Sequence, residues 1–154
     1  MRFGYRDSIA KHTRTIILSA RLKLGRGDVT AARKLFAEHS AYKREHQPLK
    51  FPSAGCMFKN YVIQPNDEVV RQAFPEYAAA GKIPAWALIT GAGLAGRRIG
   101  NIQISDLHAN FFLNLGGGTA EHVIMLASLV KQKVRERYAV QLQEEVQFIG
   151  FANL

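Results

Sequence analysis

The stretch RIGNIQISDLHANFFLNL, residues 98–115, carries the clearest fold signal in the chain. It holds two runs rich in Ile, Phe and Leu, at 98–105 and 110–115, and both have the composition of β-strands. Residues 106–108 lie between the two runs and are typical of a turn. The stretch therefore predicts two strands joined by a short connection.

A glycine run and a long helix are expected next. Gly116, Gly117 and Gly118 could gather backbone N–H groups around a phosphate, but without the lysine of a P-loop a flexible turn is the favoured interpretation. Thr119 is a suitable N-cap for a helix that continues to about Tyr138. Apolar residues recur in that helix at helical spacing, at Val123, Leu126, Val130 and Val134.

The first part of the chain predicts one strand and one helix. Residues 15–24 open with an apolar run and then alternate, as a half-buried strand does. Asp28 can cap a helix over 29–44, one face of which carries Ala32, Leu35, Phe36 and His39. Two prolines at 48 and 52 break any helix, so the segment that contains Cys56 is expected to be irregular or a short strand.

The remaining predicted elements are short. We expect helices over 68–74 and 84–89, and a closing strand over 146–151. Helices and strands mix without regular alternation and without internal repeats. This pattern favours an α+β fold, a small antiparallel sheet with packed helices, over a doubly wound sheet.

Composition and charge narrow the classes of partner. The 154 residues suit one domain, and 47% hydrophobic content is enough for a core. A net charge of +9 favours an anionic partner, which charge alone leaves open as nucleic acid, an acidic membrane surface or a phosphorylated small molecule. The chain has no apolar run near the ~20 residues that span a bilayer and no signal-peptide core, so we expect a cytoplasmic protein.

The single cysteine, Cys56, lies in the run PSAGCMFKN at 52–60. It cannot form an internal disulfide, and its small neighbours would let a ligand approach it closely. The alternative is a free cysteine that simply fills space. The five histidines show no metal-like spacing, so no metal site is expected, and the scattered aromatic residues weaken the interpretation as a nucleic-acid-binding protein.

Three separated segments favour a chemical role for Cys56 over a space-filling one. They are FGYRDS at 3–8, PSAGCMFKN at 52–60 and LQEEVQFIG at 142–150. Together they resemble the active-site segments of the UDP-N-acetylenolpyruvoylglucosamine reductases, flavoenzymes of peptidoglycan synthesis. Residues 92–114 are similar to the substrate-domain core of that family, and the run through HAN at 108–110 is more similar to its compact branch.

The resemblance implies a reaction and three catalytic residues. In the family, NADPH reduces a bound FAD, and the reduced flavin passes a hydride to UDP-N-acetylglucosamine enolpyruvate, which becomes UDP-N-acetylmuramate. By this resemblance Arg6 neutralises the substrate carboxylate, and Glu145 hydrogen-bonds the same group or polarises the alkene. Cys56 occupies the position of the proton donor, where many members carry serine. A thiol, with a pKa of ~8.5 in model peptides, is a stronger acid than an alcohol and suits that task.

The resemblance also implies substrate-binding residues. They are Tyr5, Arg44, Gln47, Lys59, Asn60 and His108. Among them, Asn60 matches a residue near the nucleotide diphosphate, and His108 lies where another type of member has a glutamine that faces the substrate. Each of these residues could instead be a solvent-exposed or structural polar residue. For His108 the substrate-binding and the structural interpretations are equally favoured.

The family's flavin-binding portion, roughly as long as this whole chain, has no counterpart in the sequence. The resemblance implies that residues 1–24 are the tail of the FAD-binding domain, with remnant strands, and that residues 25–140 are the substrate-binding domain. Residues 141–154 would form a terminal strand that returns to the first domain. We therefore expect the chain alone to bind FAD poorly and to need a partner that supplies the N-terminal half.

Three functions remain open at this point. The first is the reductase, complete only with its N-terminal half. The second is a catalytically silent substrate-domain remnant that binds a UDP-sugar. The third, less favoured, is a basic nucleic-acid-binding module, for which the positive net charge is the main support.

Overall fold

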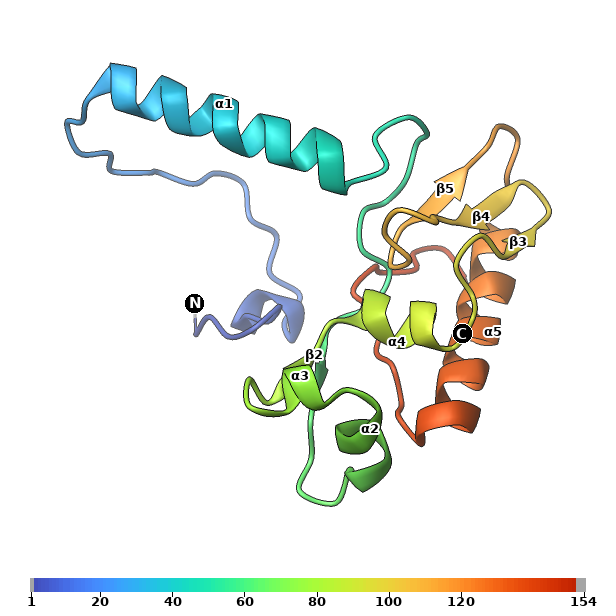
Figure 1. Cartoon of the computed structure of the whole chain (residues 1–154). Helices are drawn as coiled ribbons and strands as arrows, with labels where there is room; N and C mark the ends of the chain where they lie inside the picture. Colours follow the sequence, from blue (N-terminus) through green and yellow to red (C-terminus); the bar gives the residue numbers. More distant parts are fainter. Residues whose placement is uncertain (1, 152–154) are drawn as a thin grey trace. The chain divides into compact units, whose positions relative to one another are not determined.

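The computed structural model describes residues 2–151, and the chain divides into two units, Met1–Glu45 and His46–Leu154. Helices and small antiparallel sheets mix along the chain, so the predicted α+β class is confirmed (Figure 1). The domain boundaries expected near residues 24 and 140 remain predictions.

The main sheet of the second unit comes from the stretch 98–115. Strands β3 (Arg98–Ile99), β4 (Ile102–Ile104) and β5 (Phe112–Asn114) are antiparallel neighbours in that order. The run 98–105 therefore forms two strands rather than the one predicted. The chain turns back at Gly100, whose φ of 54° is accessible to glycine at little cost.

Helix α5 (Ala120–Tyr138) packs against this sheet. It begins at the predicted cap: the hydroxyl of Thr119 accepts a hydrogen bond from the backbone N–H of His122, and Nδ1 of His122 accepts one from the N–H of Thr119, both at 3.3 Å. This reciprocal pair satisfies two N–H groups at the helix start. The side chains predicted to face the core are fully buried at Leu126, Val130 and Val134 and partly buried at Val123.

Short elements complete the second unit. Helices α2 (Glu68–Ala73) and α4 (Ala85–Gly91) agree with the helices predicted near those positions, and α3 (Pro75–Ala78) directly follows α2. Strand β1 (Tyr61–Val62) pairs antiparallel with β2 (Lys82–Ile83). Buried side chains from α2, α4, β4 and α5 belong to one core cluster.

The first unit holds the 3-10 turn η1 (Ile9–Lys11) and helix α1 (Val29–His46), which reaches one residue into the second unit. Asp28 caps α1 as predicted, because its Oδ1 accepts hydrogen bonds from the N–H groups of Thr30 at 2.7 Å and Ala31 at 3.2 Å. None of the residues described between 2 and 45 is buried. This unit therefore has secondary structure without a core of its own.

Three predictions about packing are wrong. The run 15–24 forms no strand, and its apolar side chains are almost fully exposed: Ile16 81%, Leu18 91%, Leu22 82% and Leu24 85%. The helix face expected to be apolar and packed is open, with Phe36 74% exposed. Residues 146–151 also form no strand. A strand needs hydrogen-bond partners, and no described residue pairs with either run.

A buried asparagine in the turn just before β5 holds an irregular segment in place. Asn110 is 2% exposed, its Oδ1 accepts a hydrogen bond from the N–H of Phe58 at 2.9 Å, and its Nδ2 donates to the carbonyl of Phe58 at 2.8 Å. The backbone carbonyl of Asn110 accepts a third bond, from the N–H of Met57 at 2.8 Å. Phe58 itself is 1% exposed, so its backbone groups have no access to water and depend on this side chain.

His108, in the turn before β5, lies between two aromatic rings. Its ring centroid is 4.8 Å from that of Phe111 and 6.2 Å from that of Trp86. Its Nδ1 is buried and has no hydrogen-bond partner among the described residues. Desolvation by burial lowers the pKa of His108 below its ordinary value of 6.5, so the imidazole is neutral at pH 7.

We expect Asn110→Ala to lower the free energy of unfolding by about 2–4 kcal/mol, because it leaves a buried donor and a buried acceptor of Phe58 unsatisfied. The measurement is urea unfolding followed by circular dichroism. Asn66→Ala, at an exposed turn position, is the control and should change stability by less than about 0.5 kcal/mol. Equal stability of the two variants would contradict the importance given to these bonds.

His108 also predicts a pH dependence of stability. Because its pKa is lowered in the folded chain, the unfolded chain takes up the proton first as the pH falls. The stability associated with neutral His108 is present above about pH 6.5 and is lost as the pH falls towards the folded pKa. Thermal unfolding between pH 7.5 and 5 should therefore show a smaller decrease in Tm for His108→Gln than for the unsubstituted chain. An identical decrease would show that His108 does not contribute.

Candidate functional site

Tyr5 and Arg6 occupy the tip of a tight turn in the first unit. Gly4 and Asp7 close the turn with two backbone hydrogen bonds, at 3.0 and 3.3 Å, and Arg6 adopts a left-handed φ of 55°. The guanidinium of Arg6 lies 5.7 Å from the centroid of the Tyr5 ring. The structure thus presents the two side chains predicted to meet the substrate from adjacent positions of one turn.

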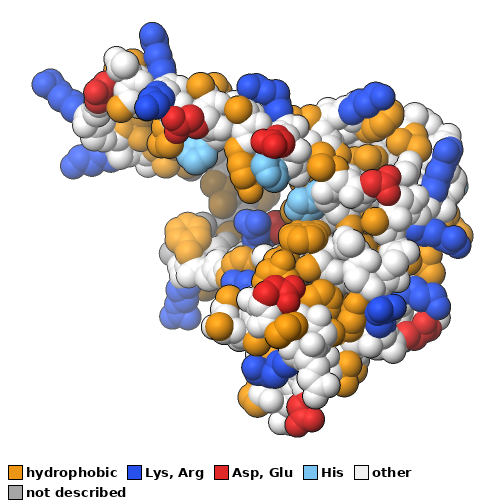
Figure 2. Space-filling model, in the orientation of Figure 1, with side chains coloured by type: hydrophobic (Ala, Val, Ile, Leu, Met, Phe, Trp, Pro, Cys, Tyr) orange, Lys and Arg blue, Asp and Glu red, His pale blue; other side chains and the backbone are white. Residues whose placement is uncertain are grey.

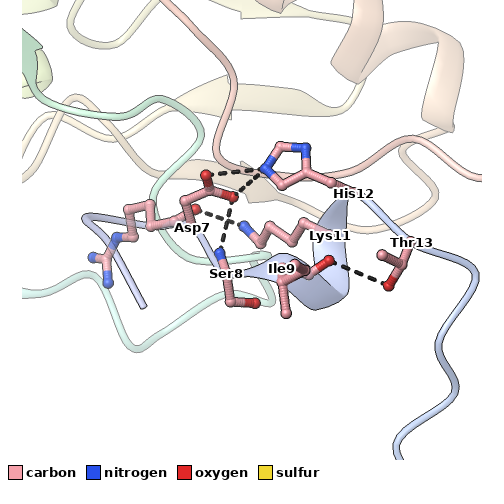
Figure 3. A network of polar contacts seen from close by, with 7 residues as sticks. Asp7, Ser8, Ile9, Lys11, His12 and Thr13 are labelled. Atoms are coloured by element: carbon pink, nitrogen blue, oxygen red, sulfur yellow. Dashed lines mark hydrogen bonds and ion pairs between the residues drawn. The ribbon is translucent and has the colours of Figure 1, made fainter. Parts of the chain in front are cut away.

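Polar contacts brace this turn from the following residues (Figure 3). Nε2 of His12 lies 2.8 and 3.0 Å from the two carboxylate oxygens of Asp7, and this hydrogen bond lowers the pKa of Asp7 below its ordinary value of 3.8. The ammonium of Lys11 donates to the carbonyl of Arg6 at 2.8 Å. The carboxylate next to Arg6 therefore already has a hydrogen-bonding partner in His12.

Cys56 lies on an extended segment that the second unit holds against the start of β5. It forms an antiparallel bridge with Phe111, and the next residue, Met57, donates its N–H to the carbonyl of Asn110 at 2.8 Å. Gly55 precedes it with a φ of 85°, so the chain bends sharply before the cysteine. The side chain of Cys56 is half-buried, whereas Met57 and Phe58 are almost fully buried.

The C-terminal segment brings Glu145 to the same place from the other end of the sequence. The N–H of Glu145 donates to the carbonyl of Met57, and the N–H of Lys59 donates to the carbonyl of Gln143, both at 2.8 Å. Phe58 and Glu144 are the paired residues between these two bonds. Cys56 and Glu145, 89 positions apart in the printed numbering, are therefore on adjacent backbone segments.

An ion pair fastens this C-terminal segment to α5. The ammonium of Lys131 lies 2.8 Å from Oε1 of Glu144, and both side chains are about one-third exposed, at 31% and 29%. The pair is too exposed to contribute much more than about 1 kcal/mol to stability. Its effect is geometric, because Glu144 directly precedes Glu145.

Two more predicted substrate residues continue the cysteine segment. Lys59 is partly exposed and pairs through its backbone with Gln143. Asn60 has a structural task that the sequence left open: its Oδ1 accepts a hydrogen bond from the N–H of Ala85, at 3.2 Å. Ala85 is the first residue of α4, so Asn60 satisfies one of the N–H groups that a helix start leaves without an intrahelical partner.

The remaining predicted residues lie in different surroundings. His108 joins the cysteine segment through Phe111, which contacts its ring and also pairs with Cys56. Gln47, directly after α1, is partly exposed. Arg44 is exposed on α1 and belongs to the first unit together with Tyr5 and Arg6. The second unit thus gathers Cys56, Lys59, Asn60, His108 and Glu145.

The glycine run is a turn whose donors are already engaged. Oδ1 of Asn114 accepts hydrogen bonds from the N–H groups of Gly116 and Gly118, both at 3.0 Å. Nδ2 of Asn101 donates to the carbonyl of Gly116 at 2.7 Å. Two of the N–H groups that a phosphate would need therefore serve the turn itself.

Sequence reasoning missed Asn110 and a neighbouring cavity. The cavity, of about 420 Å³, is lined by residues 52–55 before Cys56 and by residues of β5 and the start of α5. Nothing in the sequence indicates it, because its walls come from four separate segments of the chain. Asn110 did carry a signal: it is a polar residue at the head of an apolar strand, where a buried polar side chain must have partners.

Two other kinds of feature, a metal centre and a membrane-spanning helix, are absent from the part of the chain that the structure describes. Among residues 2–151, no three His, Cys, Asp or Glu side chains are grouped closely enough to hold a metal ion. No described helix has both the length and the apolar character needed to cross a membrane.

Comparisons with known proteins cover almost the whole chain. The family model described as UDP-N-acetylenolpyruvoylglucosamine reductase, C-terminal domain, matches residues 47–149. The UDP-N-acetylenolpyruvoylglucosamine reductase of Solibacter usitatus is 35% identical over 150 residues, which cover 96% of this chain and 48% of the relative. That of Fervidobacterium nodosum is 40% identical over 146 residues, 94% of this chain and 41% of the relative.

A solved structure agrees with these relatives. The crystal structure of UDP-N-acetylenolpyruvylglucosamine reductase from Thermus caldophilus matches with a TM-score of 0.58 and 31% identity, over 82% of this chain and 38% of that one. The chain spans about half the length of the curated relatives that it matches. Since the family model matches residues 47–149 and the relatives are similar over almost the whole chain, this chain belongs to the UDP-N-acetylenolpyruvoylglucosamine reductase family and contains its C-terminal domain.

Proposed function

We propose that this chain is the substrate-binding, proton-donating part of an FAD-dependent reductase that oxidises NADPH and converts UDP-N-acetylglucosamine enolpyruvate to UDP-N-acetylmuramate in peptidoglycan synthesis. Membership of the family supports the reaction. The observation that carries the proposal is the adjacency of the Cys56 and Glu145 segments, joined by the hydrogen bond from Glu145 N–H to Met57 C=O. A cytoplasmic location suits this reaction and is part of the proposal.

Each catalytic residue has a task set by its chemistry. Cys56 donates its thiol proton to the α-carbon of the enolpyruvyl group, where negative charge develops after hydride transfer to the terminal carbon. Glu145 hydrogen-bonds the substrate carboxylate or polarises the alkene. Arg6 neutralises the carboxylate with its rigid fork of N–H donors. The turn closed by Gly4 and Asp7 supports this role, because it presents Arg6 at a tip.

Binding of the nucleotide part rests on cations and amides. Lys59 supplies positive charge near the diphosphate, and Arg44 and Gln47 add contacts from the end of α1. With the Oδ1 of Asn60 bonded to Ala85, its NH₂ group is oriented as a donor for a diphosphate oxygen. Neutral His108 can give or accept one hydrogen bond, and Tyr5 contacts the substrate beside Arg6.

FAD would supply the hydride when bound, and the glycine run of this chain does not fit its diphosphate. The glycine run at 116–118 is the candidate cradle for its diphosphate, and two of its N–H groups already donate to Asn114. We propose that the portion of the relatives that this chain does not span holds FAD, and that the exposed apolar side chains of the first unit pack against that portion. Figure 2 shows hydrophobic side chains exposed among charged side chains and His along α1.

A second candidate function is a UDP-sugar-binding remnant without catalysis. Isothermal calorimetry with a UDP-sugar and NADPH oxidation with an added N-terminal half separate the two: the remnant binds without turnover.

The proton-donor role predicts an ordered series of rates. In the chain combined with an N-terminal half, Cys56→Ser should keep substantial NADPH oxidation, because an alcohol also donates a proton, whereas Cys56→Ala should lose at least ~10²-fold in kcat. Steady-state kinetics with the enolpyruvyl substrate measure this series. An alanine variant as fast as the unsubstituted protein would remove Cys56 from the mechanism.

The first unit predicts where the N-terminal half attaches. Leu18→Glu and Phe36→Glu should leave the chain's own Tm unchanged, since both side chains are exposed, yet prevent co-purification with the N-terminal half of the Solibacter usitatus relative. The flavin absorbance band of the purified complex reports the association.

Val69→Glu is the matched control. It makes the same apolar-to-acidic change at a side chain that is 54% exposed on α2 of the second unit, and the complex with the flavin-bearing half should persist. Loss of the complex in the control alone, or a complex that forms with all three variants, would show that the exposed apolar side chains of the first unit do not bind the N-terminal half.

A further inference from the structure

We propose that Lys11 and His12 are positioning residues that hold Arg6 in its left-handed backbone conformation, an inference that rests on the role proposed for Arg6. Neither residue needs to touch the substrate for this task. Both act on the backbone of the turn that carries Arg6, through the contacts that Figure 3 draws.

The turn places Arg6 in a conformation that an arginine rarely adopts. Its φ is 55°, in the left-handed region where the Cβ of any residue other than glycine comes too close to a carbonyl oxygen. Such residues persist only where the surrounding structure holds them, and they gather at functional sites. None of the residues described between 2 and 45 is buried, so a core does not give this support. Hydrogen bonds to the turn have to give it.

The first support is a bond to the peptide group of Arg6 itself. The ammonium of Lys11 donates to the carbonyl of Arg6 at 2.8 Å. A charged donor makes this bond stronger than one between neutral groups. The direction of the carbonyl is set by the ψ angle of Arg6. The bond therefore favours the observed conformation over any that turns the carbonyl away from Lys11.

The second support acts on Asp7, the residue at which the turn closes. Nε2 of His12 lies 2.8 and 3.0 Å from the two oxygens of the Asp7 carboxylate, and Oδ1 also accepts the N–H of Ser8 at 2.9 Å. The bond to His12 lowers the pKa of Asp7, so the ionised carboxylate that accepts these bonds is favoured at pH 7. Asp7 and Gly4 join the two ends of the turn through their backbones. His12 thus restrains the position directly after Arg6.

One 3-10 turn, η1, brings both side chains back to the Arg6 turn. The N–H groups of Lys11 and His12 donate to the carbonyls of Ser8 and Ile9, at 3.0 and 3.1 Å. The chain therefore reverses immediately after the turn instead of continuing as an extended segment. As a result the two side-chain contacts each span five positions and fall on two consecutive residues of the turn. This pairing of consecutive residues carries the proposal.

NMR of the chain as it exists tests the restraint without FAD or substrate. In a left-handed residue the amide proton lies close to the Hα of the same residue, so Arg6 should give a strong NOE between these two protons. The double variant Lys11→Met/His12→Ala removes both supports and should weaken this NOE to the intensity typical of a residue with negative φ. Lys34→Met/His39→Ala is the matched control. It removes the same groups from exposed positions of α1 and should leave the NOE unchanged.

Kinetics separate positioning from a structural role. In the chain combined with an N-terminal half, Lys11→Met should lower kcat/KM about fivefold, and Lys11→Arg, which keeps a charged donor, should restore most of it. Arg6→Ala should itself lower kcat/KM at least about tenfold. In that background Lys11→Met should change kcat/KM by less than about 1.5-fold, because no guanidinium remains to be positioned. A mere loss of folded protein would lower the rate equally in both backgrounds.

Lys34→Met also serves as the kinetic control, because it removes one positive charge without touching the turn, and it should keep the unsubstituted kcat/KM. An undiminished Arg6 NOE in the Lys11→Met/His12→Ala variant overturns the proposal. A fivefold effect of Lys11→Met that persists in the Arg6→Ala background overturns it as well. Failure of the proposed function has a different signature, an unsubstituted complex that does not oxidise NADPH, and the NOE would still decide whether Lys11 and His12 hold the turn.

Discussion

The second unit depends on the hydrogen bonding of a short buried segment, residues 57–59. Met57 and Phe58 are almost completely buried, so the backbone groups of this segment must find partners inside the protein. They find them in the Asn110 amide on one side and in 143–145 on the other. Because Cys56 and Glu145 flank these bonds, the same constraint that stabilises the fold also brings the two candidate catalytic residues together.

The two units differ in the way they are stabilised. The second has a continuous core built from α2, α4, β4 and α5, and its polar groups at Thr119, Asn114 and Asn110 close turns and helix starts around that core. The first unit has a well-capped helix and a braced turn but no buried residue. Local hydrogen bonds define its elements, and only burial against a further layer of protein would stabilise their arrangement.

Sequence reasoning succeeded where the signal was local. Asp28 and Thr119 were predicted as caps because a cap requires only a side-chain oxygen a few residues from free N–H groups. The core-facing positions of α5 followed from a 3.6-residue period. It failed at 15–24 and 146–151. An alternating or apolar run indicates which side chains a strand would bury, but it does not show that a partner strand is present to accept its backbone hydrogen bonds.

The sequence alone determined the identity of the candidate chemistry: a lone cysteine among small residues, an arginine near the N-terminus, a glutamate near the C-terminus, and the resemblance that orders them. Only the tertiary structure decided that the Cys56 and Glu145 segments are neighbours, that Asn60 serves the start of α4, and that Asn110 holds the cysteine segment in place. The physical reason is the same in each case. A side chain's type is a property of one position, but a buried hydrogen bond between positions 52 residues apart exists only when the chain has folded.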